Sequence, residues 1–204
     1  MDEHSKKLLS DNYRNLLLKH GAGPAVGQWS QAGQIFRFEK LIQIDNLASK
    51  RILDLGCGIG DLYPFLQERF CEIDYSGIDL VPELIACASH KYPRAKFFCR
   101  DILQAGLDEQ YDYVLISGMF NNPIPNCTAF LKEMIALAFK HCRKGLAFNF
   151  TSTHVNYSVP NHAYHDPAEV LAFCIANLTR KVFFYHHYER CDVAVFAYKQ
   201  ELGN

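Results

Sequence analysis

The chain has 204 residues, of which 49% are hydrophobic and 21% charged, and its formal net charge is -1. This composition excludes a disordered chain and predicts one globular domain with a full core. Proteins that bind nucleic acids through phosphate contacts carry an excess of basic residues, so the balanced charge argues against a nucleic-acid partner.

The eight cysteines include no C-x-x-C pair, so the sequence contains no zinc or dithiol motif, and we expect no bound metal. Residues 1–20 lack the uninterrupted apolar segment of a signal peptide. No apolar run approaches the ~18 residues that a membrane-spanning helix requires. We therefore expect a cytoplasmic protein with reduced thiols and no membrane partner, present as a monomer or a homodimer.

The N-terminal segment is predicted to form two helices, over residues 5–20 and 35–47, separated by a glycine-rich loop. Residues 20–34 hold four of the 12 glycines and the only tryptophan, Trp29. Glycine-rich loops of this kind can move over a binding site. We expect residues 1–48 to form a helical lid or cap and residues 49–204 to form the core of the same domain.

From residue 51 onward, strand patterns alternate with helical patterns. The expected strands cover 51–56, 73–80, 95–102, 111–119 and 145–150, and the expected helices cover 61–70, 82–91, 128–142 and 167–177. Two further strands, over 181–188 and 192–199, surround a short turn and predict a closing hairpin. This alternation predicts a Rossmann-like α/β fold, a three-layer αβα sandwich around a seven-stranded, mostly parallel sheet with an antiparallel last strand.

A glycine loop follows the first expected strand, in the sequence Asp54-Leu55-Gly56-Cys57-Gly58-Ile59-Gly60. Its glycines let the backbone turn sharply, and we expect the loop N–H groups and the next helix to face a ligand. The spacing is G-x-G-x-G, which differs from the dinucleotide fingerprint G-x-G-x-x-G. Asp61, the expected N-cap of that helix, adds a negative charge that would repel a pyrophosphate. The loop therefore suits a ligand with a polar or cationic group.

Two further acids end the next two expected strands. Asp79 can accept hydrogen bonds from both hydroxyls of a ribose, or it can cap the helix that follows. Asp101 can accept a bond from an exocyclic adenine amine, or it can be an ordinary loop acid. Because the carboxyl ends of parallel strands share one edge of a sheet, we expect these acids and Asp54 to meet at one site.

The segments ILDLGCGIG, GIDL, CRDI and YDYVLISG, in this order, resemble the motifs of class I S-adenosylmethionine-dependent methyltransferases, over about residues 50–200. The resemblance implies S-adenosylmethionine as the cofactor and S-adenosylhomocysteine as its product. It further implies that the methionine part faces Asp54, Gly56, Cys57 and Gly58, the ribose Asp79 and Leu80, and the adenine Asp101 and Ile102, with Ser117 lining the same cleft.

The N-terminal pattern HGxG…GQWS…Q…RF resembles the lid of small bacterial methyltransferases that act on metabolites. The resemblance implies that Arg37 pairs with the cofactor carboxylate and that Trp29 closes over the cleft. A surface ion pair for Arg37 and a core anchor for Trp29 are the alternatives.

Methyl transfer from a sulfonium is an in-line displacement, for which the protein positions the acceptor and excludes water. Oxygen and nitrogen acceptors often lose a proton, and His154, in the loop after the fifth expected strand, is the predicted base. A polar loop without catalytic histidines is the alternative. Phe120, Asn121 and Tyr157 are expected to contact the acceptor.

The segment Asn122-Pro123-Ile124 departs from the [N/D]-P-P-[Y/F] motif of enzymes that methylate amino groups of adenine or glutamine. The sequence also contains no basic tract interleaved with aromatic residues. We therefore expect transfer to an oxygen or nitrogen atom of a small-molecule acceptor. The alternatives are a protein or tRNA acceptor, a cofactor-binding module without catalysis, and a nicotinamide oxidoreductase, which Asp61 disfavours.

Overall fold

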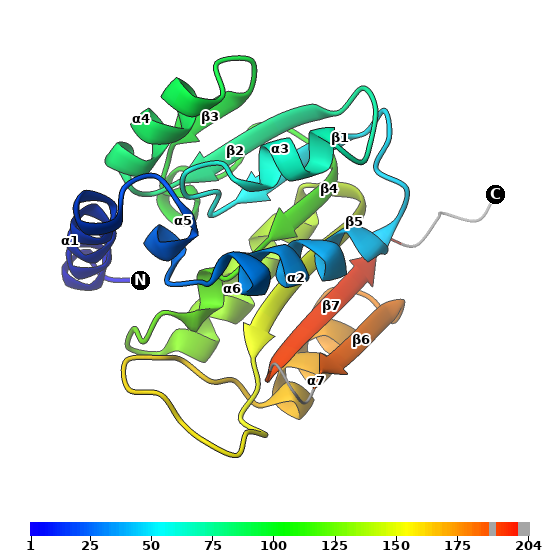
Figure 1. Cartoon of the computed structure of the whole chain (residues 1–204). Helices are drawn as coiled ribbons and strands as arrows, with labels where there is room; N and C mark the ends of the chain where they lie inside the picture. The colour runs from blue at the N-terminus through cyan, green and yellow to red at the C-terminus, as the bar shows by residue number, and fades with distance from the viewer. Residues whose placement is uncertain (188–190, 200–204) are drawn as a thin grey trace.

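The computed structural model describes residues 1–187 and 191–199. One seven-stranded sheet runs through the molecule in the order β3-β2-β1-β4-β5-β7-β6 (Figure 1). The first five strands pair in parallel, and β7 runs antiparallel to both β5 and β6, as predicted. The strands are β1 (Arg51–Leu55), β2 (Asp74–Asp79), β3 (Lys96–Cys99), β4 (Tyr111–Ile116), β5 (Cys142–Thr151), β6 (Val182–His187) and β7 (Asp192–Tyr198).

The central strands are apolar on both sides because helices cover both faces of the sheet. In β4, Val114 and Ile116 face one core and Tyr113 and Leu115 face the other, since successive side chains of a strand alternate. The first core includes α6 (Cys127–Lys140) and α7 (Pro167–Asn177), and the second includes α2 (Gln31–Leu41) and α3 (Leu62–Gln67).

The helix predictions hold best where a proline occupies the first turn. α4 (Pro82–Lys91) and α7 coincide with the predictions at both ends. The expected strand 95–102 is shorter and ends at Cys99, because Asp101 begins the short helix α5 (Ile102–Ala105) by accepting a hydrogen bond from the Leu103 N–H at 3.0 Å. Asp101 consequently lies at a helix start beside the ends of β2 and β3.

Residues 1–48 divide into two parts instead of forming one lid. α1 (Glu3–His20) and the 3-10 turn η1 (Pro24–Gly27) lie beside the carboxyl ends of the strands (Figure 1). By contrast, α2 and the turn η2 (Ile42–Ile44) pack onto the sheet and bury Phe38, Leu41 and Ile44 in the second core. Only the part before α2 can therefore act as a lid. Within the described residues, no helix has both the length and the apolar character needed to cross a membrane.

Candidate active site

A cleft opens at the carboxyl ends of β1, β2 and β4, the edge at which open α/β sheets bind ligands. The space inside it is about 990 Å³ when its open mouth is included. α1 covers one side of the cleft, and the glycine loop forms the opposite side. The predicted residues that line it are Trp29, Gly56, Gly58, Asp79, Leu80, Asp101, Ile102 and Ser117.

A second compartment of about 480 Å³ adjoins the cleft. Asp54, Cys57, Asp61 and Gln34 line it and do not line the first. The two compartments share Tyr13, Gly27, Trp29, Gly56, Gly58, Leu84 and Ser117. These shared residues mark the junction at which a long ligand would pass from one compartment to the other.

The glycine loop bonds to β2 through its amides. The N–H groups of Gly56 and Cys57 donate to the Ile78 carbonyl at 2.8 and 3.1 Å, and the Gly58 N–H donates to Asp79 at 2.9 Å. These three N–H groups are therefore bonded to β2, whereas the prediction has the loop N–H groups face the ligand. With its amides directed toward β2, the loop suits a cationic group better than an anionic one.

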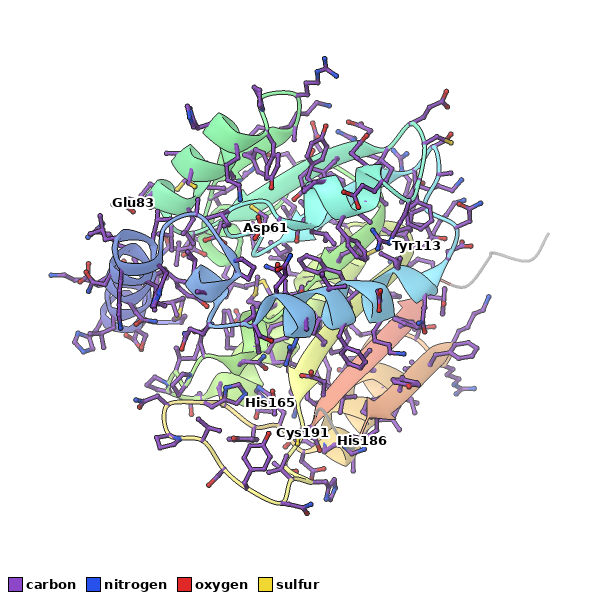
Figure 2. All side chains as sticks on the ribbon, viewed as in Figure 1. Asp61, Glu83, Tyr113, His165, His186 and Cys191 are labelled. Carbon is purple, nitrogen blue, oxygen red and sulfur yellow. The ribbon has the colours of Figure 1, made fainter. Side chains whose placement is uncertain are left out.

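Asp61 occupies the N-cap position of α3, but its side chain makes no capping bond there, contrary to prediction. Its carboxylate instead lies 2.8 Å from the Lys91 ammonium and accepts a hydrogen bond from the Gln34 amide at 3.2 Å. Asp61 has helical backbone angles, with φ at -65° and ψ at -20°, instead of the extended backbone of a capping residue. Asp61, labelled in Figure 2, thus joins α2, α3 and α4 beside the second compartment.

Asp79 braces the glycine loop and lines the cleft. Its two carboxylate oxygens accept hydrogen bonds from Gly58 N–H and Val81 N–H, each at 2.9 Å. The N-cap of α4 is Val81, so Asp79 does not cap that helix. Burial raises the pKa of Asp79. Each carboxylate oxygen can accept a second hydrogen bond, so Asp79 can still receive hydroxyl groups from a ligand.

Asp101 joins the lid to the core. One of its carboxylate oxygens bonds the Leu103 N–H, and the other lies 2.6 Å from the ammonium of Lys6 in α1. Lys6 also pairs with Glu3 at 2.7 Å, within the same helix. The acid predicted to contact an adenine amine is therefore already in contact with the lid.

Asp54 is buried at the end of β1 and accepts a hydrogen bond from the Tyr75 hydroxyl at 2.7 Å. Burial raises the pKa of Asp54 to about 7. A cationic ligand group beside this carboxylate would favour its ionised form. Asp54 therefore suits an ammonium group in the second compartment.

Comparison with known proteins bears on the kind of protein that carries this cleft. A family model described as a methyltransferase domain matches residues 52–141. The Mycobacterium tuberculosis protein Rv1506c, named provisionally as a methyltransferase, is 27% identical over 157 residues, which are 72% of this chain and 92% of that protein. The crystal structure of magnesium protoporphyrin IX methyltransferase from Synechocystis PCC 6803 with bound SAM has a TM-score of 0.67 at 18% identity and covers 98% of both chains.

Together these comparisons support a class I S-adenosylmethionine-dependent methyltransferase. The predicted fold, enzyme class and cofactor are confirmed. The DhpI–SAH complex has the same fold, with a TM-score of 0.68 at 17% identity, and covers 96% of this chain and 97% of that one. Malonyl-[acyl-carrier protein] O-methyltransferase from Acetivibrio thermocellus is 32% identical over 82 residues, 39% of this chain but only 29% of that protein.

Two residues of this methyltransferase were predicted from the lid pattern, with Trp29 over the cleft and Arg37 beside the cofactor carboxylate. The structure places Trp29 at the cleft and Arg37 outside it. The Trp29 ring lines both compartments. The Arg37 guanidinium lines neither, because it stacks on Trp29 and pairs with Asp192 at 2.8 Å. The geometry therefore does not support the predicted pairing of Arg37 with the cofactor carboxylate.

The residues predicted to contact the acceptor lie outside both compartments. Phe120 is 2% exposed and packs against Phe148 in the first core. Asn121 is buried and accepts a hydrogen bond from Thr151 N–H at 3.2 Å, while Tyr157 is 63% exposed. The turn η3 (Met119–Asn121) directs the first two side chains inward, which their position after a strand could not reveal.

His154, the predicted base, is exposed in the loop between β5 and α7. Its ring centroid lies 6.3 Å from that of His186, which Figure 2 shows at the β6 end of the sheet, across the molecule from Asp61. His165 in the same loop is buried and bonds the Phe120 carbonyl at 2.8 Å, so it fastens the loop to η3. The geometry does not support His154 as a base.

Sequence reasoning missed the polar pair at the lid. The Tyr13 hydroxyl lies 3.1 and 3.2 Å from the amide nitrogen and oxygen of Asn122, and both residues line the cleft. Burial raises the pKa of Tyr13 to about 12. The helical pattern of residues 5–20 gave no sign of which side chains would turn toward the site.

Proposed function

We propose that this methyltransferase transfers the methyl group of S-adenosylmethionine to an oxygen or nitrogen atom of a small-molecule acceptor. The observation that carries the proposal is the closure of the cleft by α1. That helix is anchored to three separate elements, through Lys6 to Asp101, Arg14 to Glu83, and Tyr13 to Asn122. Glu83 lies on the α4 side of the lid (Figure 2). A covered cleft suits a small molecule better than a folded protein or a tRNA.

The residues of the cleft fit the cofactor. Asp79 and Leu80 would hold the ribose, and Asp101 with Ile102 would contact the adenine. Asp54 and the loop from Gly56 to Gly58 would face the methionine part, whose ammonium group suits a carboxylate. The bound cofactor supplies a methyl group on a positively charged sulfur, which is a good leaving group.

The protein's contribution is to orient the acceptor and exclude water. Apolar walls from Met119, Ile124, Phe130 and Met134 support a partly apolar acceptor. Beside them, the Tyr13 hydroxyl is protonated at neutral pH, as any tyrosine is, and burial raises its pKa further. This hydroxyl or the amide of Asn122 would hold the polar atom of the acceptor.

The names of relatives support transfer to a small acceptor group. They include O-methyltransferases of malonyl-[acyl-carrier protein] and a trans-aconitate 2-methyltransferase of Rhodopseudomonas palustris, the latter 24% identical over 120 residues. In each case the similarity to this chain covers only part of the relative's length. These names therefore support a substrate class and not a particular substrate.

The test has two stages. Calorimetry with S-adenosylmethionine, S-adenosylhomocysteine and NAD should give micromolar binding of the first two and no binding of NAD. The protein is then incubated with methyl-labelled S-adenosylmethionine and three separate fractions of a cell extract, which contain small molecules, tRNA and protein. We expect label in the small-molecule fraction. Label in the tRNA or protein fraction alone would contradict the proposal.

A further inference from the structure

Contacts with Trp29, Asp192 and Gly33, all among the described residues, hold the Arg37 guanidinium outside the cleft. It stacks on the Trp29 ring at 3.7 Å from the ring centroid, lies 2.8 Å from an Asp192 carboxylate oxygen, and donates to the Gly33 carbonyl at 3.0 Å. The side chains of Arg37 and Asp192 are only 11% and 7% exposed. The guanidinium is thus held between β7, the start of α2 and the indole of Trp29.

Trp29 forms the wall at the junction of the two compartments. The ring also packs on Gly118, the second residue after β4, so closely that a Cβ at Gly118 would lie 2.9 Å from the ring. The Gly118 N–H in turn donates to the Asn149 side chain of β5 at 2.7 Å. The indole is therefore held between the guanidinium on one side and the backbone at the end of β4.

We propose that Arg37 is a positioning residue for the cofactor, acting through Trp29 without touching the cofactor itself. A planar guanidinium can stack on an indole while its N–H groups pair with a carboxylate. A lysine ammonium can keep the ion pair with Asp192 but cannot stack in the same way. The shape of the cleft wall then depends on arginine at this position and not on positive charge alone.

This inference differs from direct recognition of the cofactor carboxylate by Arg37. The guanidinium contacts are directed toward Asp192, Gly33 and Trp29, so a carboxylate in the cleft would have to displace them. The two mechanisms can be separated with a ligand that has no amino-acid part. 5′-Methylthioadenosine keeps the adenosine and sulfur of the cofactor but lacks the carboxylate.

The experiment measures binding of S-adenosylhomocysteine and 5′-methylthioadenosine by calorimetry to Arg37→Lys, Trp29→Phe and the double variant. We expect Arg37→Lys to raise the Kd of both ligands by about 3- to 30-fold, the range of a stacked cation on an indole. In the Trp29→Phe background the same change should have a smaller effect, because a phenyl ring attracts a stacked cation less strongly than an indole does. Neither measurement requires a known acceptor, so failure of the proposed function would leave this test intact.

Arg69→Lys is a matched control. Arg69 stacks on Phe65 at 3.6 Å, donates to the Phe65 carbonyl at 3.2 Å and pairs with Glu68, but it does not line the cleft. Its substitution should leave both affinities unchanged. Trp29 is the only tryptophan, so the emission spectrum should shift in Arg37→Lys and not in Arg69→Lys.

Three outcomes would overturn the inference. An effect on S-adenosylhomocysteine but none on 5′-methylthioadenosine would mean that Arg37 holds the amino-acid part. An equal effect with and without Trp29 would mean that Arg37 acts through some other contact. Unchanged affinity for both ligands in Arg37→Lys would mean that stacking does not position the cleft wall.

Discussion

The ammonium of Lys6 lies 2.6 Å from a carboxylate oxygen of Asp101, so the lid helix and the proposed adenine site share one ion pair. The two side chains are only 11% and 19% exposed, which limits screening of the pair by salt. An adenine amine beside Asp101 would share this carboxylate with the lid. Docking of α1 and binding of the adenine would thereby be linked through one acid.

Replacement of Lys6 by methionine should speed release of the cofactor product. The methionine keeps most of the apolar stem but removes the contact that fastens α1 to Asp101. We expect the dissociation rate of S-adenosylhomocysteine to rise several-fold in stopped-flow experiments that follow Trp29 emission. Lys7→Met, at the exposed neighbouring position, is the control and should behave like the wild type. An unchanged rate in Lys6→Met would show that this ion pair does not hold the lid.

Asp79→Asn should weaken binding of the cofactor more than any other conservative change in the cleft. It removes the charge that accepts the proposed ribose hydroxyls while keeping the size of the side chain. We expect the Kd of S-adenosylhomocysteine to rise at least about tenfold, because a hydrogen bond to a charged group is worth ~1.5–3 kcal/mol. Calorimetry provides the measurement. Asp74→Asn, at the exposed start of β2, should leave the Kd unchanged, and equal Kd values for the two variants would refute the ribose assignment.

Asp54 should make cofactor binding depend on pH. Its pKa of about 7 means that the carboxyl is half protonated near neutral pH without ligand. A cofactor ammonium prefers the ionised form, so S-adenosylmethionine should bind more tightly at about pH 8 than at about pH 6. In Asp54→Asn the affinity should change little over this interval. 5′-Methylthioadenosine, which has no ammonium group, should show the same lack of pH dependence with the wild type.

The Asp54 carboxyl should also make stability depend on pH, with stability falling as pH rises while cofactor binding strengthens. Its pKa is raised from the ordinary value of 3.8 to about 7 on folding, so between these values the folded chain binds more protons than the unfolded one. The contribution of Asp54 to the free energy of unfolding therefore falls as pH rises from about 4 to 7. Urea unfolding of the wild type and Asp54→Asn should show the wild type losing relative stability across this interval. A constant difference between the two would mean that the pKa is not raised.

The sequence predicted the acidic residues at the strand ends better than the residues of α1 that line the cleft. Asp54 and Asp79 lie at the ends of β1 and β2, and Asp101 follows β3 by two residues. Parallel strands bring their carboxyl ends to one edge, so local pattern was enough to place the three acids together. The lid contacts of Lys6 and Tyr13 depend on how α1 docks, which the spacing of apolar residues in one helix does not determine. Long-range packing therefore decided the part that sequence reasoning missed.

The loop after β5 contains a residue that sequence reasoning placed in the site and that the structure places outside it. Histidine chemistry suggested a base there, but the path of a 15-residue connection is set by its tertiary contacts, such as the bond of His165 to the Phe120 carbonyl. That path leaves His154 exposed beside His186. Position in the sequence after a strand end was insufficient to place a side chain in the cleft.

His154→Ala should therefore leave methyl transfer and cofactor affinity unchanged. The side chain lines neither compartment, so its removal alters no group that touches the ligands. Once an acceptor has been found, kcat and KM measured across the neutral pH range should match those of the wild type. A large fall in kcat with unaltered cofactor affinity would return His154 to the role of base.

Gly118→Ala tests whether the position of the Trp29 ring, which packs on Gly118, controls cofactor binding. Gly118 has a φ of 71°, and a Cβ there would lie 2.9 Å from the Trp29 ring, so alanine both strains the backbone and displaces the indole. Gly106→Ala is the control, because its φ of 70° and ψ of -172° strain an alanine at least as much as the φ of 71° and ψ of 1° at Gly118, with nothing within 4 Å of the added carbon. Each variant should lose about 1–3 kcal/mol in urea unfolding from the backbone conformation. Only Gly118→Ala should also shift Trp29 emission and raise the Kd of S-adenosylhomocysteine, whereas equal Kd values in the two variants would mean that the position of the indole does not control binding.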